Sequence, residues 1–293
     1  MLYDVAIIGG SYAGLSAAMP LVRARKNIIV IDAGERRNRF AEHSHGFLTQ
    51  DGTPASEIVS QAKEQLQKYS TFEWQTGSVK RIETVADEFY ICVDQLRSIQ
   101  AKRIIIASGV TDQLPNIQGL AERWGKSVFH CPYCHGYELN LGNIAILATN
   151  PHAFHMAMML PDWGTTTLLL NGQALLNDFE KEQLQKRAVI LDDRTIQCID
   201  HHADIVFDHG EVGHFDGLFV QTKPQIQQAW IEKLGCKIEK NEFGQFLQTS
   251  VLKETSVKGI FACGDVARLG GSVPLAVGDG MLAGMSAHKS LIF

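Results

Sequence analysis

Two cysteines separated by two residues are the side chains in this sequence best suited to chemistry. Cys131 and Cys134 lie in the run HCPYCHG, residues 130–136. Thiols at this spacing can close a small disulfide, and a helix start or a nearby cation can hold one of them as a thiolate near neutral pH. We therefore predict a redox-active pair that passes two electrons, with Cys131 and Cys134 as catalytic residues.

A structural zinc site is the alternative interpretation of this run, because His130 and His135 flank the two cysteines. Four ligands packed so tightly in sequence cannot all surround one tetrahedral ion, so a zinc site would need a second paired cluster. The other cysteines stand singly in apolar or loop contexts, at Cys92, Cys198, Cys236 and Cys263. The sequence favours redox chemistry over zinc, and we predict no metal site.

The composition indicates an α/β protein with many tight turns. The chain has 293 residues, of which 45% are hydrophobic and 26 are glycine, and this length allows two domains. A net charge of -5 without a basic cluster argues against nucleic-acid binding. The first ten residues lack the basic segment of a signal peptide, and no apolar run is long enough to span a bilayer. We therefore predict a cytoplasmic protein without membrane contact.

The first forty residues contain the elements of a dinucleotide site. An apolar strand over residues 5–8 ends in the turn GGSYAG, residues 9–14, before a helix; a second strand over residues 28–31 ends in an acid. In such a site the turn lets a pyrophosphate approach backbone N–H groups at the helix start, and the acid binds a ribose hydroxyl. The expected cofactor contacts are Gly9, Gly10, Ser11, Ala13, Gly14 and Asp32.

Two residues depart from the usual form of this motif. Ser11 replaces the middle glycine of G-x-G-x-x-G, although its hydroxyl can itself donate to phosphate. Pro20 lies inside the expected helix and is predicted to kink or shorten it. A plain strand-to-helix turn is the alternative interpretation of the whole motif.

The end of the chain indicates which dinucleotide binds. Residues 258–266, KGIFACGDV, form a buried strand that closes on a glycine and an acid, and residues 104–109, IIIASG, form a similar strand. With the N-terminal turn, these motifs resemble those of flavoproteins that have two dinucleotide-binding domains. The resemblance implies FAD as the cofactor, assigns its ribityl chain to Asp265, and adds contacts at Ala107, Gly109 and Gly264.

A helix is expected beyond the Gly-Asp motif. Residues 272–274, SVP, are typical of a helix start with proline in the first turn, and Ala276, Gly280 and Gly284 form a small-residue face. Such a face lets a helix approach a flat ring closely, and the helix N-terminus would stabilise negative charge on reduced flavin. We count Ala276 among the cofactor contacts; packing against a sheet is the alternative for this face.

The cysteine pair and the flavin motifs together make the chain resemble the low-molecular-weight thioredoxin reductase family nearly end to end. The shared features include the closing VGDG helix at residues 277–280. The resemblance implies an α/β fold with two Rossmann-like three-layer domains. A discontinuous FAD domain, residues 1–110 and 221–293, is interrupted by a smaller nucleotide-fold domain, residues 111–220, that carries the cysteines. The resemblance also implies a homodimer.

In that family the inserted domain binds NADPH, but this sequence lacks the residues for it. The strand at residues 143–147 runs into ATNPHA, residues 148–153, which contains no glycine; Asn150 and Pro151 supply a helix N-cap and first position instead. After the second strand, residues 167–170, neither an acid for NADH nor an arginine for NADPH follows. We therefore expect no high-affinity nicotinamide site in this domain.

This absence, together with the histidine that follows the cysteine pair, resembles the dithiol oxidase branch of the family, which includes the gliotoxin and holomycin oxidases. The loop at residues 40–52, with HSHGF at 43–47, is similar too. The resemblance implies oxidation of a substrate dithiol through FAD with oxygen as acceptor. A substrate thiolate would attack Cys131, and Cys134 would be the flavin-facing thiol.

His135 is the residue that we expect to exchange protons with these thiols. Its unperturbed pKa lies near working pH, and it directly follows Cys134. Tyr137 and Glu138 are expected to orient it, and the histidine pair at 43–45 is expected to face the flavin. A loop histidine bonded to backbone is the alternative role for this residue.

Two other functions stay open at the level of sequence. The first is reduction of a thioredoxin-like protein, with electrons from NADPH at a divergent site, from ferredoxin or from reduced flavin. It predicts an exposed, partner-sized surface beside the cysteines, whereas an oxidase of small dithiols predicts a closed pocket. The second is a flavoprotein sensor whose cysteines switch its shape without turnover. The expected partner is therefore a small-molecule dithiol or a thioredoxin-like protein.

Overall fold

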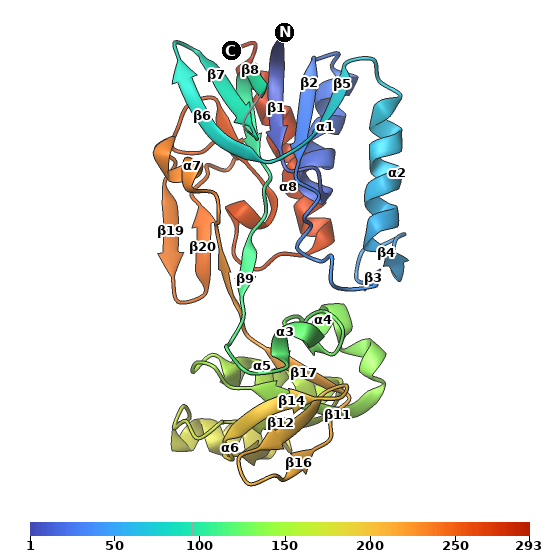
Figure 1. Cartoon of the computed structure of the whole chain (residues 1–293), viewed down its shortest axis with the longest axis vertical. Helices are drawn as coiled ribbons and strands as arrows, with labels where there is room; N and C mark the ends of the chain where they lie inside the picture. Colours follow the sequence, from blue (N-terminus) through green and yellow to red (C-terminus); the bar gives the residue numbers. More distant parts are fainter. Residues whose placement is uncertain (95–96) are drawn as a thin grey trace. The chain divides into compact units, whose positions relative to one another are not determined.

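The computed structural model describes residues 1–94 and 97–293, which form two compact units (Figure 1). The first unit comprises Met1–Arg39, Phe47–Asp112 and Lys223–Phe293. The second comprises Phe40–Gly46 and Gln113–Thr222. The chain leaves the first unit in β9 (Thr111–Gln113) and returns at β18 (Lys223–Gln225).

One segment groups differently from the sequence-based division. Phe40–Gly46, which the sequence assigns to the FAD domain, packs with the second unit. Gly125 explains part of this packing, because a Cβ built on it would lie 2.6 Å from the Cβ of Phe40. The placement of residues 40–46 therefore depends on Gly125, which lies outside this segment. The sequence of the segment alone does not predict this contact.

The first unit is built on a seven-stranded sheet in the order β5-β2-β1-β8-β7-β6, with β21 also paired to β8. Its nucleotide-binding half is parallel, and β6, β7 and β8 pair in antiparallel fashion. The strands are β1 (Leu2–Ile8), β2 (Ile28–Asp32), β5 (Phe72–Thr76), β6 (Val79–Val85), β7 (Glu88–Val93), β8 (Arg97–Ile106) and β21 (Ile260–Ala262).

Both faces of this sheet are covered, which is why its central strands are apolar throughout. In β1, Val5 and Ile7 pack with the helices of one face, whereas Ala6 and Ile8 pack with the opposite layer. The helical layer contains α1 (Tyr12–Arg23), α2 (Ala55–Gln67) and α8 (Val273–Ser290). The opposite layer contains α7 (Ala229–Lys233) and the hairpin of β19 (Ile238–Asn241) and β20 (Gly244–Leu247). Two short elements complete the first unit, β4 (Thr53–Pro54) and the 3-10 helix η3 (Gly264–Ala267), whereas β3 (His43–Ser44) belongs to the segment grouped with the second unit.

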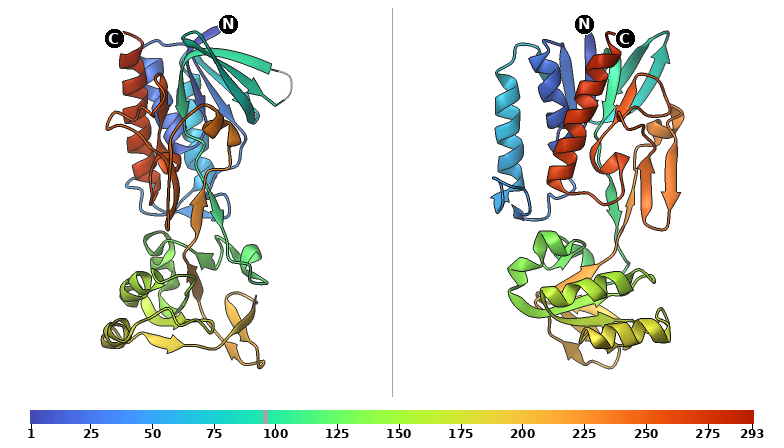
Figure 2. Two further views of the ribbon diagram at one scale, coloured as in Figure 1. Left: turned by 90° about the vertical axis from the view of Figure 1, so that its left-hand side faces the viewer. Right: turned by 180° about the vertical axis from the view of Figure 1, so that it is seen from behind.

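Helix α8 lies beside α1 on this face (Figures 1 and 2). It begins as predicted, with Ser272 as N-cap and Pro274 in the first turn. Its small residues contact α1: a Cβ built on Gly280 would lie 2.1 Å from the carbonyl oxygen of Ala13, and one on Gly284 would lie 2.2 Å from that of Ala17. The glycines of the small-residue face are therefore explained by helix–helix packing and not by a flat ring or a sheet.

The prediction that Pro20 shortens α1 is not met at the proline itself, and the predicted kink stays a prediction. The helix continues through the proline to Arg23. The proline ring lies where α8 approaches, since its Cγ would be 2.7 Å from a Cβ on Gly284. Pro20 would disfavour an isolated helix, and in this structure it packs against α8.

The second unit has a parallel five-stranded sheet in the order β10-β17-β11-β12-β13 and an antiparallel sheet of β14, β15 and β16. One core lies between the parallel sheet and the helices, and another lies on the side of the antiparallel strands. The strands are β10 (Val128–Phe129), β11 (Leu141–Leu147), β12 (Gly164–Leu169), β13 (Ile190–Asp192), β14 (Ile196–Asp200), β15 (Asp204–Phe207), β16 (Val212–Gly213) and β17 (Gly217–Val220). The helices are α3 (Leu120–Arg123), α4 (Pro132–His135), η1 (Tyr137–Leu139), α5 (Ala153–Met159), η2 (Leu160–Asp162) and α6 (Asp178–Lys186).

Each unit is thus a three-layer, Rossmann-like arrangement, and the α/β fold class predicted from the sequence is confirmed. Among the described residues, no helix has the length and hydrophobicity that a bilayer crossing requires.

The contact between α1 and α8 can be tested with two glycines of the same helix. Gly280→Ala should destabilise the protein by about 1–3 kcal/mol, because the added methyl group meets the backbone of α1. Gly278→Ala is the matched control, since its Cβ would enter open space, and it should stabilise the helix by about 0.5–1 kcal/mol. Urea unfolding of the FAD-free variants measures both changes. Equal effects of the two substitutions would contradict the packing argument.

Candidate active site

Cys131 and Cys134 are joined in a disulfide in the second unit. Their Cα atoms lie 5.3 Å apart, within the normal range for a bridged pair. The local sequence forms this turn: Cys131 is the N-cap of α4, Pro132 takes the first helical position, and the backbone N–H of Cys134 donates to the carbonyl oxygen of Cys131 at 3.2 Å. The pair is therefore positioned by residues within one helical turn.

The two sulfur atoms bond to each other and not to a metal ion. Across residues 1–94 and 97–293, no group of three or more histidine, cysteine, aspartate or glutamate side chains could hold a metal ion. The four other cysteines are free thiols.

His135 stacks on the ring of Phe129, with ring centroids 4.3 Å apart. Burial of the imidazole lowers the pKa of His135 to about 4, and positive charge on His130 or His45 would lower it further. His130 in turn stacks on Trp124 at 5.7 Å. At neutral pH His135 is therefore an uncharged imidazole beside the disulfide, able to accept a proton.

Glu138 contacts His45 and not His135, which differs from the sequence-based prediction. Its Oε1 lies 3.4 Å from Nδ1 of His45, a residue of the segment that groups with the second unit. The side chain of Tyr137 is 85% exposed, and its role in orienting His135 stays a prediction. The His135 ring stacks on Phe129.

Exposed aromatic residues flank the disulfide. Tyr133 is 72% exposed and makes an edge contact with Trp163, with centroids 5.3 Å apart. Gly136 lies against the same indole, where a Cβ would be 2.7 Å from the ring. Tyr133 and Tyr137, which lie close to Cys134 and His135 in the sequence, are thus both largely exposed.

In the first unit, the glycine turn after β1 is formed by close backbone contacts. Gly9 has φ +106°, and a Cβ built on it would lie 2.2 Å from the carbonyl oxygen of Ala107. A Cβ on Gly14 would lie 1.8 Å from the carbonyl oxygen of Gly9, and one on Gly10 would lie 2.2 Å from the indole of Trp74. These contacts allow α1 to begin directly behind β1, in the arrangement that binds a pyrophosphate at a helix start.

The residues predicted to bind FAD therefore come together around this turn. Ser11 is the N-cap of α1, Ala13 is buried in its first turn, and Gly264, with φ +73°, lies next to Ala13. Gly109 has φ +65° and an open surrounding. Ala276 is buried in α8 near Gly264. A dinucleotide fits this set, and the contact of each residue with FAD stays a prediction.

The two acids predicted to bind FAD are held by different partners. The carboxylate of Asp32 accepts hydrogen bonds from the backbone N–H of Gly10 at 2.9 Å and of Gly34 at 3.1 Å. Asp265, in η3, is bound by Arg37 at 2.7 Å. The sequence reasoning missed Arg37, because its only signal was a short basic run, and its partners are far away along the chain.

The turn after β11 in the second unit is closed by hydrogen bonds across the sheet. The side-chain N–H of Gln221, which follows β17, donates to the carbonyl oxygen of His152 at 3.0 Å, and Thr149 Oγ1 donates to that of Gln221 at 3.5 Å. Asn150 does not cap α5 as predicted, because its Oδ1 accepts from the N–H of His152, which is itself the N-cap residue. Chain order reverses between β11 and β17, which is where folds of this kind bind a nucleotide. Gln221 bridges that position.

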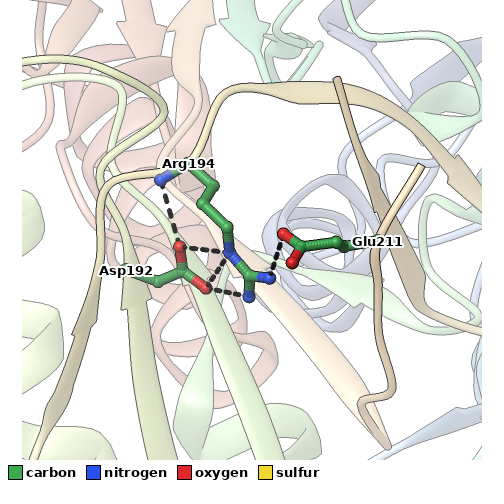
Figure 3. Close-up of polar contacts among 3 residues, drawn as sticks. All are labelled: Asp192, Arg194 and Glu211. Carbon is green, nitrogen blue, oxygen red and sulfur yellow. Dashed lines mark hydrogen bonds and ion pairs between the residues drawn. The ribbon is translucent and has the colours of Figure 1, made fainter. Parts of the chain in front are cut away.

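Arg194, which follows β13, is held by two carboxylates (Figure 3). Its guanidinium donates to Asp192 through Nε at 3.0 Å and Nη2 at 2.6 Å, and to Glu211 through Nη1 at 3.0 Å. It also lies over the ring of Phe207, 3.8 Å from the centroid. These two carboxylates offset the positive charge of Arg194.

A family model for pyridine nucleotide-disulphide oxidoreductases matches residues 3–280. The chain belongs to this family. Its relatives include thioredoxin reductase tcpT from Claviceps purpurea, 31% identical over 99% of this chain and 95% of that protein, and thioredoxin reductase sirT from Leptosphaeria maculans, 30% identical over 98% and 94%. The predicted resemblance to thioredoxin reductases is confirmed.

Solved structures agree with this assignment. An oxidoreductase from Agrobacterium tumefaciens superimposes with a TM-score of 0.98 at 52% identity and covers 100% of this chain and 99% of its own. The structure of HlmI gives 0.91 at 29% identity, with 99% and 92% covered. As a member of the pyridine nucleotide-disulphide oxidoreductases, the protein is an FAD-dependent disulfide oxidoreductase, as predicted.

The charge of His135 gives a pH-dependent prediction for the oxidised protein. Because the folded protein takes up this proton near pH 4 and an unfolded chain near its ordinary pKa of about 6.5, the free energy of unfolding should fall as pH is lowered from about 6.5 to 4, by roughly 2 kcal/mol. An NMR titration of the imidazole resonance that disappears in His135→Gln measures the pKa directly. Reduction of the disulfide should raise it, because a neighbouring thiolate favours imidazolium. A midpoint above about pH 6 in the oxidised protein would exclude this environment.

Proposed function

We propose that this member of the pyridine nucleotide-disulphide oxidoreductases oxidises substrate dithiols to disulfides through Cys131, Cys134 and FAD, with dioxygen as the final acceptor. The observation that carries the proposal is the turn after β11. It contains no glycine, and Gln221 bridges it to the end of β17 at 3.0 Å. A protein that does not take electrons from a nicotinamide nucleotide must receive them from its thiol substrate or from another donor.

The cysteine pair accepts the electrons in this proposal. A substrate thiolate attacks Cys131, the Cys131–Cys134 bond breaks, and a mixed disulfide forms with Cys134 leaving as thiolate. The second substrate thiol then attacks the mixed disulfide, which forms the product disulfide and releases Cys131. The substrate has lost two electrons and two protons, and the pair is a dithiol. When bound, FAD supplies the two-electron carrier between this dithiol and dioxygen.

His135 moves protons at this pair. Its neutral imidazole accepts a proton as a substrate thiol becomes thiolate, and the Cys134 thiolate that forms beside it stabilises the imidazolium. Stacking on Phe129 keeps the ring in place during both steps. The catalytic residues proposed are therefore Cys131, Cys134 and His135.

Reduction of a thioredoxin-like protein is the second candidate function. It is favoured by the names of the relatives from Claviceps purpurea and Leptosphaeria maculans, both thioredoxin reductases. The exposed rings of Tyr133 and Tyr137 beside the disulfide would also suit a protein partner. In this case electrons would flow outward through the pair, from NADPH, ferredoxin or reduced flavin.

The direction of electron flow can be measured with the purified holoenzyme under anaerobic conditions. Dithiothreitol should bleach the flavin absorbance, and admission of air should restore it with one hydrogen peroxide formed for each dithiol oxidised. NADPH should leave the flavin oxidised over the same time. Rapid bleaching by NADPH, followed by reduction of an added thioredoxin, would instead establish the reductase.

Cysteine variants provide the controls for this experiment. Cys131→Ser and Cys134→Ser should each lower the rate of dithiol-dependent bleaching by at least about 1,000-fold, because neither can complete the exchange. Cys198→Ser should react as the wild type, since that thiol is free and lies outside the pair. Bleaching that survives in both active-site variants would mean that the dithiol reduces FAD without the pair.

We also propose that the protein is a homodimer, assembled through α8. Leu275, Met281 and Met285 are exposed on this helix. Apolar side chains aligned along one helix are typical of a surface that another chain covers. The cytoplasmic location stays a prediction.

Light scattering after gel filtration tests this assembly. Met281→Glu should shift the molar mass from dimer to monomer, because a charge would be buried at the contact. Val85→Glu, at an exposed apolar position of β6 in the same unit, should leave the dimer intact. A monomeric wild-type protein, or a dimer that Met281→Glu does not affect, would exclude this interface.

A further inference from the structure

We propose that Arg37 is a positioning residue for FAD, which fixes the carboxylate of Asp265 while Asp112 holds the guanidinium in place. The three residues come from separate parts of the first unit: the loop after β2, strand β9 and η3. Asp265 is the acid to which the family resemblance assigns the ribityl chain of FAD.

Arg37 forms hydrogen bonds with both carboxylates at once. Its Nε and Nη2 donate to the two oxygens of Asp112, each at 2.7 Å, and its Nη1 donates to Oδ2 of Asp265 at 2.7 Å. This is a bidentate contact on one side and a single contact on the other. A planar guanidinium can make it, whereas the compact ammonium of lysine cannot hold two oxygens of one carboxylate in this geometry.

Burial indicates that this network orients groups and adds little to stability. The side chain of Asp112 is 5% exposed, and those of Arg37 and Asp265 are 20% and 21% exposed. Removing such charges from water costs about as much free energy as their attraction returns, so a buried ion pair is a weak source of stability. The hydrogen bonds of this network nevertheless fix the orientation of the three side chains, because each charged group has a partner in a defined direction.

Asp265 is confined on a second side by Gly271. A Cβ built on Gly271 would lie 2.0 Å from Oδ1 of Asp265, so the carboxylate occupies the space of the missing side chain. Arg37 contacts the other oxygen, Oδ2. The carboxylate is thereby held in one orientation before any ligand arrives, which reduces the entropy lost on binding.

The neighbouring residue connects the same loop to the glycine turn. Asn38 donates from its side-chain amide to the hydroxyl of Tyr12, the first residue of α1, at 3.0 Å. Residues 37 and 38 therefore tie the loop after β2 to η3 and to the helix start. Both of these elements carry predicted FAD contacts.

The test is the affinity of the FAD-free protein for added FAD, followed by quenching of flavin fluorescence. Arg37→Gln should raise the dissociation constant by about tenfold or more, since it removes a charge-assisted bond and frees the carboxylate. Arg37→Lys should raise it by a smaller factor. Arg81→Gln is the matched control, because that arginine is 67% exposed and pairs with the exposed Glu83 in the same unit.

Two further variants separate positioning from direct contact between Arg37 and FAD. Asp112→Asn should also weaken FAD binding, because the guanidinium of Arg37 loses the charge of its bidentate partner. In the Asp265→Asn background, Arg37→Gln should cause little additional loss. Full loss in that background, or tighter FAD binding by Asp112→Asn, would overturn the proposal in favour of direct contact.

Folding is checked independently of FAD. The circular dichroism spectrum of the FAD-free Arg37→Gln variant should resemble that of the wild type, whereas urea unfolding should show a loss of stability, because two partly buried carboxylates lose the guanidinium. If that variant does not fold, Arg37→Lys and Asp112→Asn carry the test. An unchanged dissociation constant in a folded variant would show that Arg37 has no role in FAD binding, and this result is independent of whether the protein oxidises dithiols.

Discussion

Close approach of one backbone segment to another around the start of α1 is the constraint on which the first unit depends. Gly9 lies against Ala107, which follows β8, Gly14 lies against Gly9, and Gly280 lies against Ala13. At each of these positions a single methyl group would overlap backbone atoms. The sheet on one side and α8 on the other therefore fix α1, and with it the helix start that faces a dinucleotide. The same backbone contacts therefore determine both how the core packs and where the expected cofactor-binding turn lies.

In the second unit, the framework and the turns are stabilised by different groups. The parallel sheet is buried between two hydrophobic cores. The turn after β11 is held by the side chains of Gln221 and Asn150, and Arg194 pairs with Asp192 and Glu211. The fold is stabilised by burial of its strands, whereas ligand binding depends on a few turn residues, so one can persist without the other.

The protonation state of His135, next to the disulfide, depends on the hydrophobic core of the second unit. Phe129, at the end of β10, is part of the hydrophobic core and also forms the surface on which His135 stacks. The imidazole is therefore desolvated by the core of its own unit, and His130 and His45 disfavour its protonation further. A residue with an ordinary pKa near neutrality is kept uncharged next to sulfur atoms, whose own charge changes with oxidation state.

The sequence by itself determined the features that a few neighbouring residues can form. The Cys131–Cys134 turn, the glycine turn at residues 9–14, the Ser272 cap of α8 and the absence of a glycine at residues 148–153 are all local, because backbone geometry and spacing decide them. The tertiary structure alone decided which distant groups meet. Arg37 binds partners 75 and 228 residues away, His45 contacts Glu138, and Pro20 is accommodated by α8. The orientation of the side chains in such contacts depends on how helices and strands pack against one another. The residue types along one segment do not predict that packing.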